Sequence, residues 1–326
     1  MLTYWNDYPM IQNKLQTVCS LIEERFQIDN IEIQQALVNL TQAGGKFLRP
    51  TFFFLFTELG EKEKQNPQQL VKIAASLEIL HMASLIHDDI IDDSPLRRSL
   101  ITIQAQHGKD VAVYTGDLLF TIFFDLLIES MNGSAYLAKN SKAMKNLLLG
   151  ELNQMASRFQ ADSTIDNYLE NINGKTAELF ALACLEGAYF GHCSEETVLQ
   201  AEEIGRNIGM AFQIFDDILD YTADKEELKK PILEDLAQGV YTLPLLLAKK
   251  NNPEAFAPYL AKGANITIEE AKIVAEMVIT YKGVKEAKVY AKTFTNQALE
   301  LINCLPKGET KKRLKKLTTF LLLRTY

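Results

Sequence analysis

Long stretches of this chain contain neither glycine nor proline, and apolar residues recur in them at three- and four-residue spacing. The 326 residues include only 16 glycines and 9 prolines. Asn66 and Pro67, before the periodic segment 71–86, are the cap residue and first-turn proline that begin many helices. The same periodicity occurs in the segments 110–131, 141–160, 164–190 and 195–221. Alternating strand patterns are scarce, so the sequence predicts an all-α protein of roughly ten to thirteen helices.

No Gly/Ser-rich linker, low-complexity tract or short repeat interrupts the sequence, so we expect a single domain over residues 1–326. Apolar residues make up 47% of the chain and charged residues 23%, as in ordinary soluble proteins. The formal net charge of -8 disfavours nucleic acid as a partner, because an acidic chain repels the phosphate backbone.

The N-terminus has no basic region followed by an apolar run, and we expect neither a signal peptide nor a transmembrane helix. The four cysteines are irregularly spaced and form no C-x-x-C pair: Cys19, Cys184, Cys193 and Cys304. This pattern favours reduced thiols and a cytoplasmic protein.

An aspartate-rich patch occurs twice, about 128 residues apart, and each copy closes an apolar helix. The patches are Asp88-Asp89-Ile90-Ile91-Asp92-Asp93 and Asp216-Asp217-Ile218-Leu219-Asp220. Asp88 and Asp92 share a helix face, as do Asp216 and Asp220, and paired carboxylates repel unless a cation lies between them. Mg²⁺ fits, because it binds carboxylates together with substrate phosphates. One such patch could be a solvated acidic face, but two favour metal binding; Ca²⁺ fits less well, because no glycine-centred calcium loop is present.

Basic residues lie near both patches in the sequence. They are Lys46, Arg49, Arg97, Arg98, Lys175 and Lys230. Each alone would be interpreted as a surface cation. As a set, they suggest a site for two phosphorylated substrates, because arginine binds phosphate with two nitrogens and lysine binds it as a point charge.

These residues resemble the motifs of the trans-polyprenyl diphosphate synthases, including the heptaprenyl-type catalytic components of bacteria. The match runs from Gly44 to Tyr326. Its ordered motifs are Gly44-Gly45-Lys46 with Arg49-Pro50, His81, the first aspartate patch, Arg97-Arg98, Gly116-Asp117, Gly150-Glu151 with Gln154, Lys175-Thr176-Ala177, Phe212-Gln213, the second patch, Lys230-Pro231, Asp235-Leu236 and Thr242-Leu243-Pro244. The resemblance implies an all-α fold around a deep central cavity, a homodimer, and repeated condensation of isopentenyl diphosphate onto farnesyl or geranyl diphosphate.

The resemblance also implies roles for individual residues. About three Mg²⁺ ions would be held by Asp88, Asp92, Asp216 and Asp220, supported by Asp89 and Asp217. The allylic diphosphate would contact Arg97, Lys175 and Lys230. Isopentenyl diphosphate would contact Lys46, Arg49, His81 and Arg98. Thr176 and Gln213 would lie near the developing carbocation. A lone histidine on an apolar helix is more often a core residue, but His81 lies two turns before Asp88 on the same face.

Ala83 and Ser84, one turn before Asp88, bear on product length. Bulky aromatics at these positions stop chain growth in the family, so small residues predict a long product. We expect about C30 to C50, the length class of quinone side chains, since a channel on the order of 30 Å can follow a helix of ~20 residues. Met131, Tyr136 and Phe124 are candidates for the channel floor.

Three other functions remain open. A terpene cyclase would not need the residues assigned to isopentenyl diphosphate. A non-catalytic regulatory subunit should have lost its aspartates, whereas both patches are complete. A catalytic subunit that needs a small partner protein agrees with every motif, and a long product also suggests transient membrane contact at release. Three departures from the family pattern occur: Ser99 replaces a common glycine, Lys229 and Ile232 flank Lys230-Pro231 where glycine is common, and Val240 replaces a common lysine.

Overall fold

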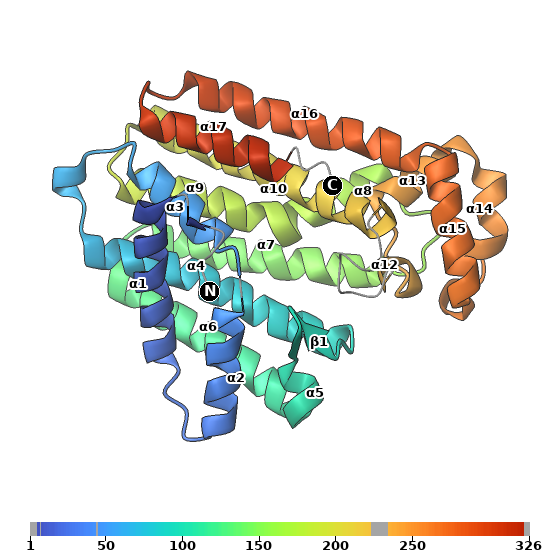
Figure 1. Cartoon of the computed structure of the whole chain (residues 1–326), viewed down its shortest axis with the longest axis horizontal. Coiled ribbons are helices and arrows are strands. Elements are labelled where there is room, and N and C mark those ends of the chain that lie inside the picture. Colours follow the sequence, from blue (N-terminus) through green and yellow to red (C-terminus); the bar gives the residue numbers. More distant parts are fainter. Residues whose placement is uncertain (1–4, 7, 44, 223–233, 323–326) are drawn as a thin grey trace. The chain divides into compact units, whose positions relative to one another are not determined.

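The computed structural model describes all residues except 1–4, 7, 44, 223–233 and 323–326, and the side chains of Glu234 and Leu322 (Figure 1). The chain forms two compact units. Unit 1 is Met1–Ser141 with Ala183–Ala201, and unit 2 is Lys142–Leu182 with Glu202–Tyr326. Helices α7 (Tyr136–Ala156), α9 (Glu178–Phe190) and α10 (Glu195–Thr222) contribute residues to both units.

The other elements of unit 1 are α1 (Pro9–Arg25), α2 (Ile31–Gln42), α3 (Leu48–Thr57), the 3₁₀ turn η2 (Lys62–Lys64), α4 (Pro67–Ile91), β1 (Leu96–Arg97), β2 (Leu100–Ile101), α5 (Ile103–His107) and α6 (Lys109–Met131). Those of unit 2 are α8 (Ile165–Ile172), η3 (Asn173–Ala177), α12 (Glu234–Ala237), α13 (Leu243–Asn251), α14 (Pro253–Leu260), η4 (Gly263–Asn265), α15 (Ile268–Thr280), α16 (Gly283–Cys304) and α17 (Glu309–Leu322). The predicted all-α class is confirmed.

Helix α4 is the central helix of unit 1. The Asn66 side chain accepts hydrogen bonds from the backbone N–H groups of Gln68 and Gln69, and Pro67 takes the first helical position, as the sequence predicts. The run from Ile73 to Leu80 is buried on every side, and α4 packs against α1, α3 and α6. A helix buried all round holds its polar residues in fixed positions, which places the first aspartate patch at the end of a rigid element.

A short hairpin follows this patch. Leu96 pairs with Ile101 and Arg97 with Leu100. Arg98 and Ser99 form the loop, with φ of 52° and 65°. Positive φ at both central residues is what a type I′ turn requires, and its right-handed twist matches the strands. Glycine is favoured in this region, which explains why the family often has it where this chain has Ser99.

The core of unit 2 forms where α10, α13, α15 and α16 bury aliphatic side chains together with Tyr168, Tyr241 and Phe256.

Between α8 and α9, residues Asn173–Ala177 form a π-helical turn instead of a continuous α-helix. Such turns often occur at functional sites, because the extra residue redirects the neighbouring side chains.

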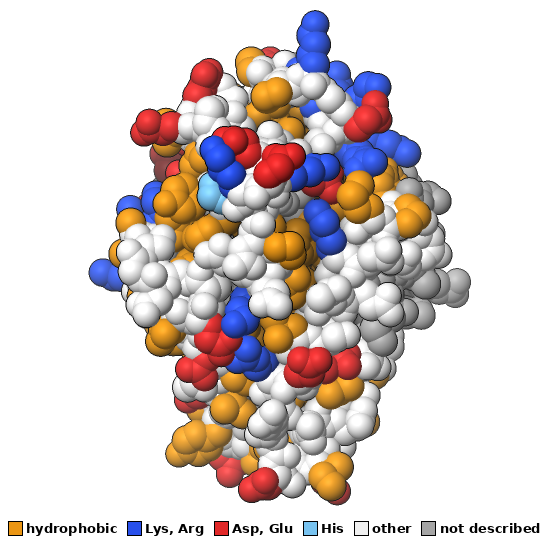
Figure 2. Space-filling view, turned by 90° about the vertical axis from the view of Figure 1, so that its left-hand side faces the viewer, with side chains coloured by type: hydrophobic (Ala, Val, Ile, Leu, Met, Phe, Trp, Pro, Cys, Tyr) orange, Lys and Arg blue, Asp and Glu red, His pale blue; other side chains and the backbone are white. Residues whose placement is uncertain are grey.

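Among the described residues, two helices are long and apolar enough to cross a membrane by length and composition, α4 and α6. A buried core helix has the same properties, and most of α4 is buried. One face of the molecule carries hydrophobic side chains mixed with charges of both signs (Figure 2).

Candidate active site

The first aspartate patch closes α4. The helix ends at Ile91, and the Asp92 N–H still donates to the Asp88 carbonyl at 2.9 Å, so the two residues lie one turn apart. Both side chains are half-buried. Carboxylates placed this way can share a hard cation that also binds a phosphorylated ligand.

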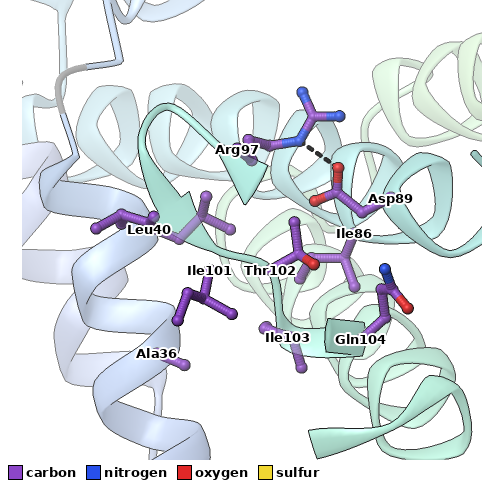
Figure 3. A pocket seen from close by; sticks show the side chains of 10 residues that line it. Ala36, Leu40, Ile86, Asp89, Arg97, Ile101, Thr102, Ile103 and Gln104 are labelled. Atoms are coloured by element: carbon purple, nitrogen blue, oxygen red, sulfur yellow. Dashed lines mark hydrogen bonds and ion pairs between the residues drawn. The ribbon is translucent and has the colours of Figure 1, made fainter. Parts of the chain in front are cut away.

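Asp89 does not share this face. It is only 5% exposed, and the Nε–H of Arg97 donates to its Oδ1 at 2.6 Å. Burial raises the pKa of Asp89 to about 6, although the positive charge of Arg97 acts against the rise. The two terminal nitrogens of the guanidinium point away from Asp89 (Figure 3). Asp89 therefore holds Arg97 by its Nε–H, while the two terminal nitrogens of the guanidinium are directed away from this carboxylate.

A small pocket lies beside this ion pair (Figure 3). Its lining is mostly aliphatic: Ala36, Leu40, Ile86, Leu100, Ile101 and Ile103, with Thr102 and Gln104. Thr102 Oγ1 and Gln104 Nε2 both donate to the Ser94 carbonyl, at 2.7 and 2.9 Å, and so fix the loop after the patch. An apolar wall lowers the local dielectric constant, which strengthens the hydrogen bond between Asp89 and Arg97.

Unit 1 also holds a cluster of cations beside α4. A Cβ added at Gly45 would lie 2.7 Å from Nη1 of Arg98, so the backbone at Gly45 passes close to this guanidinium. The pKa of Arg49 is lowered to about 10, chiefly by burial and further by Arg98. Arg98 keeps an exposed surface, yet desolvation lowers its pKa as well. Two partly desolvated guanidiniums of like charge suit the binding of an anion.

His81 lies beside these arginines. Burial lowers its pKa well below the usual value, and the charges of Arg49 and Arg98 lower it further, so the imidazole is neutral. It can offer a hydrogen bond, not a charge, to a ligand. The indole N–H of Trp5 donates to the Lys46 carbonyl at 2.8 Å, and Trp5 is 1% exposed. The segment carrying Lys46 is thus tied to the core from a distant point in the sequence.

Glu78 is a site residue that the sequence analysis missed. It is 3% exposed, one turn before His81 on α4. Burial raises its pKa, while Arg49 and Arg98 act to lower it. Glu78 is thus the acidic group that interacts electrostatically with the cation cluster. The signal available was a single acid within an otherwise apolar helix interior, since such groups are rarely buried unless paired.

The second patch lies on α10 in unit 2. Asp216 is exposed, Asp220 half-buried and Asp217 only 4% exposed. Asp217 accepts from Gln213 Nε2 at 2.8 Å and from the Tyr168 hydroxyl at 2.5 Å. Burial raises the pKa of Asp217 well above its usual value, and these two donors counteract the rise. As in the first patch, the second aspartate is turned inward and binds a neighbouring side chain.

The π turn η3 carries Lys175 and Thr176. Lys175 Nζ donates to Glu151 Oε2 and Gln154 Oε1 on α7, both at 2.8 Å. A Cβ added at Gly150 would lie 2.6 Å from the Lys175 backbone nitrogen, so glycine is required where α7 and the π turn meet. Thr176 Oγ1 donates to Gln213 Oε1 at 2.7 Å. The motifs around Glu151, Lys175 and Gln213 therefore come together in unit 2.

Four further positions singled out by the sequence analysis remain. Lys230 lies outside the described residues. Ala83 is fully buried, and the Ser84 hydroxyl donates to the His81 carbonyl at 2.8 Å. Val240 is also buried, with 9% exposure. The cation common in the family at that position has been replaced by a core side chain.

Comparison with known proteins agrees with this arrangement. A sequence family described as polyprenyl synthetase matches residues 30–277. Heptaprenyl diphosphate synthase component 2 of Geobacillus stearothermophilus is 33% identical over 319 residues, covering 98% of each chain. The crystal structure of geranylgeranyl pyrophosphate synthase from Lactobacillus brevis has a TM-score of 0.94 and 41% identity, covering 99% of this chain and 100% of that one. That of Staphylococcus aureus heptaprenyl diphosphate synthase has a TM-score of 0.91 and 33% identity, covering 96% and 98%.

The all-α fold that the resemblance implied, the isoprenoid synthase fold, and the predicted class of enzyme, a prenyltransferase that makes prenyl diphosphates, are both confirmed. The chain belongs to the polyprenyl synthetase family.

Proposed function

We propose that this enzyme condenses isopentenyl diphosphate repeatedly onto an allylic diphosphate, farnesyl or geranyl, and releases an all-trans product of about C30 to C50, a length on the order of 30 Å or more. We further propose that residues 1–326 act as one synthase domain in the cytoplasm and supply quinone side chains. The family match over residues 30–277 includes parts of both compact units, which supports a single functional domain.

One observation carries the proposal: unit 1 contains two separate groups of charged side chains, each of a kind that suits a diphosphate. The first is the face of Asp88 and Asp92 next to Arg97, and the second is the cluster of Arg49 and Arg98 against Glu78. A terpene cyclase binds one diphosphate and would not need the cluster of Arg49 and Arg98. A regulatory subunit does not catalyse the reaction and would not need the face of Asp88 and Asp92.

We assign the allylic diphosphate to the aspartate patches. Asp88, Asp92, Asp216 and Asp220 have the hard oxygen donors that Mg²⁺ prefers, with Asp89 and Asp217 in support. The described residues contain no group of three or more His, Cys, Asp or Glu side chains that could bind a metal without other ligands, so phosphate and water would complete its coordination. About three bound Mg²⁺ ions would neutralise the diphosphate leaving group. Arg97, Lys175 and Lys230 would add fixed positive charge where the leaving group becomes more negative.

We assign isopentenyl diphosphate to Lys46, Arg49, His81 and Arg98. The arginines would grip the diphosphate with paired N–H groups, and neutral His81 would add a hydrogen bond. Thr176 and Gln213 would face the allylic carbocation with oxygen atoms. Apolar surroundings would exclude water, which otherwise quenches the cation.

Product length has two candidates. Ala83 and Ser84 are small, which favours a long product. The Lactobacillus brevis structure, 41% identical to this chain, is named a geranylgeranyl synthase, which favours C20. Met131 and Tyr136 are buried and Phe124 is 40% exposed, so the first two fit a channel floor better.

The deciding experiment incubates the purified chain alone with farnesyl diphosphate, labelled isopentenyl diphosphate and Mg²⁺, and measures product length by chromatography. Products of about C30 to C50, beyond the ~20 Å of a C20 chain, confirm the proposal. A product that stops at C20 refutes the long-chain assignment. No product, rescued by a small partner protein, identifies a catalytic subunit of the kind named component 2 in the Geobacillus relative. No rescue would indicate a regulatory subunit.

Ala83→Phe should shorten a long product.

We propose a homodimer through α6. Its solvent face carries Val113, Tyr114, Leu118, Phe124 and Ile128, all exposed at helical spacing. An apolar stripe of this kind on a soluble enzyme marks a protein interface. Ile128→Glu should yield a monomer in light scattering, whereas Ile268→Glu, at an isolated exposed position on α15, should not. A dimer that survives Ile128→Glu contradicts the assignment.

We also propose that α17 contacts anionic membrane lipid during product release. Six basic residues and one acid lie within 307–316, in a chain of net charge -8. Lys312, Lys315, Lys316 and Phe320 form its exposed face. Each basic group adds about 1 kcal/mol at an anionic surface. Sedimentation should show binding to phosphatidylserine vesicles that fails at high salt; equal binding to phosphatidylcholine vesicles would refute the proposal.

A further inference from the structure

A chain of three hydrogen bonds connects Thr176 to Tyr168 in unit 2. Thr176 Oγ1 donates to Gln213 Oε1 at 2.7 Å, and Gln213 Nε2 donates to Asp217 Oδ1 at 2.8 Å. From the other side, the hydroxyl of Tyr168 donates to Asp217 Oδ2 at 2.5 Å. All three hydrogen bonds run towards Asp217, whose carboxylate is the acceptor at the centre of the series.

The direction of these hydrogen bonds determines which part of the Thr176 hydroxyl faces a ligand. A glutamine carboxamide can turn over and exchange its oxygen and nitrogen, but the oxygen of Gln213 would then face the oxygen of Asp217. Because the NH₂ group is held by Asp217, the Gln213 oxygen must face Thr176 and accept its proton. The lone pairs of the Thr176 hydroxyl, not its proton, are left for a ligand. Lone pairs stabilise a carbocation, whereas an O–H proton would repel it.

We infer that Tyr168 is a positioning residue of the condensation reaction, which acts through Asp217 and Gln213 to keep the lone pairs of Thr176 directed at the allylic carbocation. The inference rests on the proposed function and adds to it a residue that no sequence motif singled out. Tyr168 touches neither substrate nor metal in this scheme; its effect is transmitted by the orientation of one carboxylate.

The surroundings of Tyr168 suit this role. It lies on the first turns of α8, where the Thr164 side chain caps the helix by accepting from the Asn167 N–H at 3.1 Å. Its side chain is 8% exposed and packs into the core of unit 2. Burial, then the negative charge of Asp217, raise the pKa of Tyr168 well above its usual value, so the hydroxyl remains a donor.

The first test is Tyr168→Phe, which removes the hydroxyl and keeps the ring. We expect kcat to fall about tenfold, as for loss of one hydrogen bond to a carboxylate, with KM for both diphosphates changed less than about twofold. Tyr290→Phe is the control, because Tyr290 packs against the same core and takes no part in the chain of hydrogen bonds. An unchanged kcat in Tyr168→Phe overturns the inference.

The second test asks whether Tyr168 acts through Gln213. In a Gln213→Ala background the chain is already broken, so Tyr168→Phe should lower kcat less than about twofold further. If Tyr168→Phe costs the same factor in both backgrounds, its effect is independent of Gln213 and the inference fails.

A binding measurement separates this inference from the proposed function. The probe is an allylic diphosphate analogue with an ammonium nitrogen in place of the cationic carbon, titrated calorimetrically with Mg²⁺. The parent enzyme should prefer it over the neutral allylic diphosphate, and Tyr168→Phe should reduce that preference while binding the neutral ligand normally, which also shows that the variant is folded. If the parent enzyme neither condenses substrates nor binds allylic diphosphate, the proposed function fails and the inference with it. If the parent does both and the preference survives in Tyr168→Phe, only the inference fails.

Discussion

Replacing Glu78 by glutamine removes the counter-charge of Arg49 and Arg98 and keeps the shape of the side chain. The pKa of Arg49 falls from 12.5 to about 10 even with Glu78 present. At about 1.4 kcal/mol per pKa unit, this shift weakens the preference of Arg49 for its charged form by roughly 3 kcal/mol, although the guanidinium is still protonated at neutral pH. Breaking a fully buried pair costs about 3–5 kcal/mol, but Arg98 is partly solvated. We therefore expect Glu78→Gln to lower the free energy of unfolding by about 2 kcal/mol without ligand.

The same variant should bind pyrophosphate more tightly, because the site loses a negative charge and keeps its positive ones. An affinity gain of about tenfold corresponds to about 1.4 kcal/mol, so saturating pyrophosphate should restore most of the lost stability. Urea unfolding with and without pyrophosphate, and calorimetric titration of pyrophosphate, measure both quantities. Glu63→Gln, at an exposed acid in η2, is the matched control. An equal loss of stability with and without pyrophosphate, and no gain in affinity, would refute the reasoning.

Three further outcomes are expected. Burial raises the pKa of Glu186 to about 8, so between about pH 4.5 and 8 the folded protein holds a proton that the unfolded chain releases. The free energy of unfolding should therefore fall as the pH rises through this window, by at most about 1.4 kcal/mol per pH unit. Glu186→Gln should make the melting temperature depend less on pH in the same window. Ser99→Gly should raise the free energy of unfolding by about 0.5–1 kcal/mol, because strain of about 1–2 kcal/mol exceeds the entropic cost of glycine; a lower melting temperature would contradict this. Asp89→Asn should raise KM for the allylic diphosphate about tenfold by loosening Arg97, without changing the Mg²⁺ requirement, whereas Asp88→Asn should raise that requirement. A shifted Mg²⁺ requirement in Asp89→Asn would show that Asp89 binds metal.

The sequence predicted what depends on short spacing. Asp88 and Asp92 lie one turn apart because the helical repeat puts positions four apart on one face, and Asn66 caps α4 because its side chain reaches only the next turn. The assignment of metal and diphosphates to these residues remains a prediction.

The missed residues act across long sequence separations. Trp5 bonds to Lys46, and Tyr168 bonds to Asp217, 49 positions away. No periodicity encodes such pairs, because tertiary packing brings them together. Glu78 was missed for another reason: a buried acid and a solvated one look alike until the neighbouring arginines are placed around it.

The π turn at Asn173–Ala177 has a consequence for how the gene can change. A π turn has one more residue than the α-helical turn it replaces, so deleting any single codon within it would let α8 and α9 join as one regular helix. The helix would then turn by about 100° on one side of the join, since 3.6 residues make a turn. Lys175 would leave Glu151, and Thr176 would leave Gln213. Losing one residue here would therefore separate the side chains that meet at this turn, whereas a substitution would leave the length of the turn unchanged.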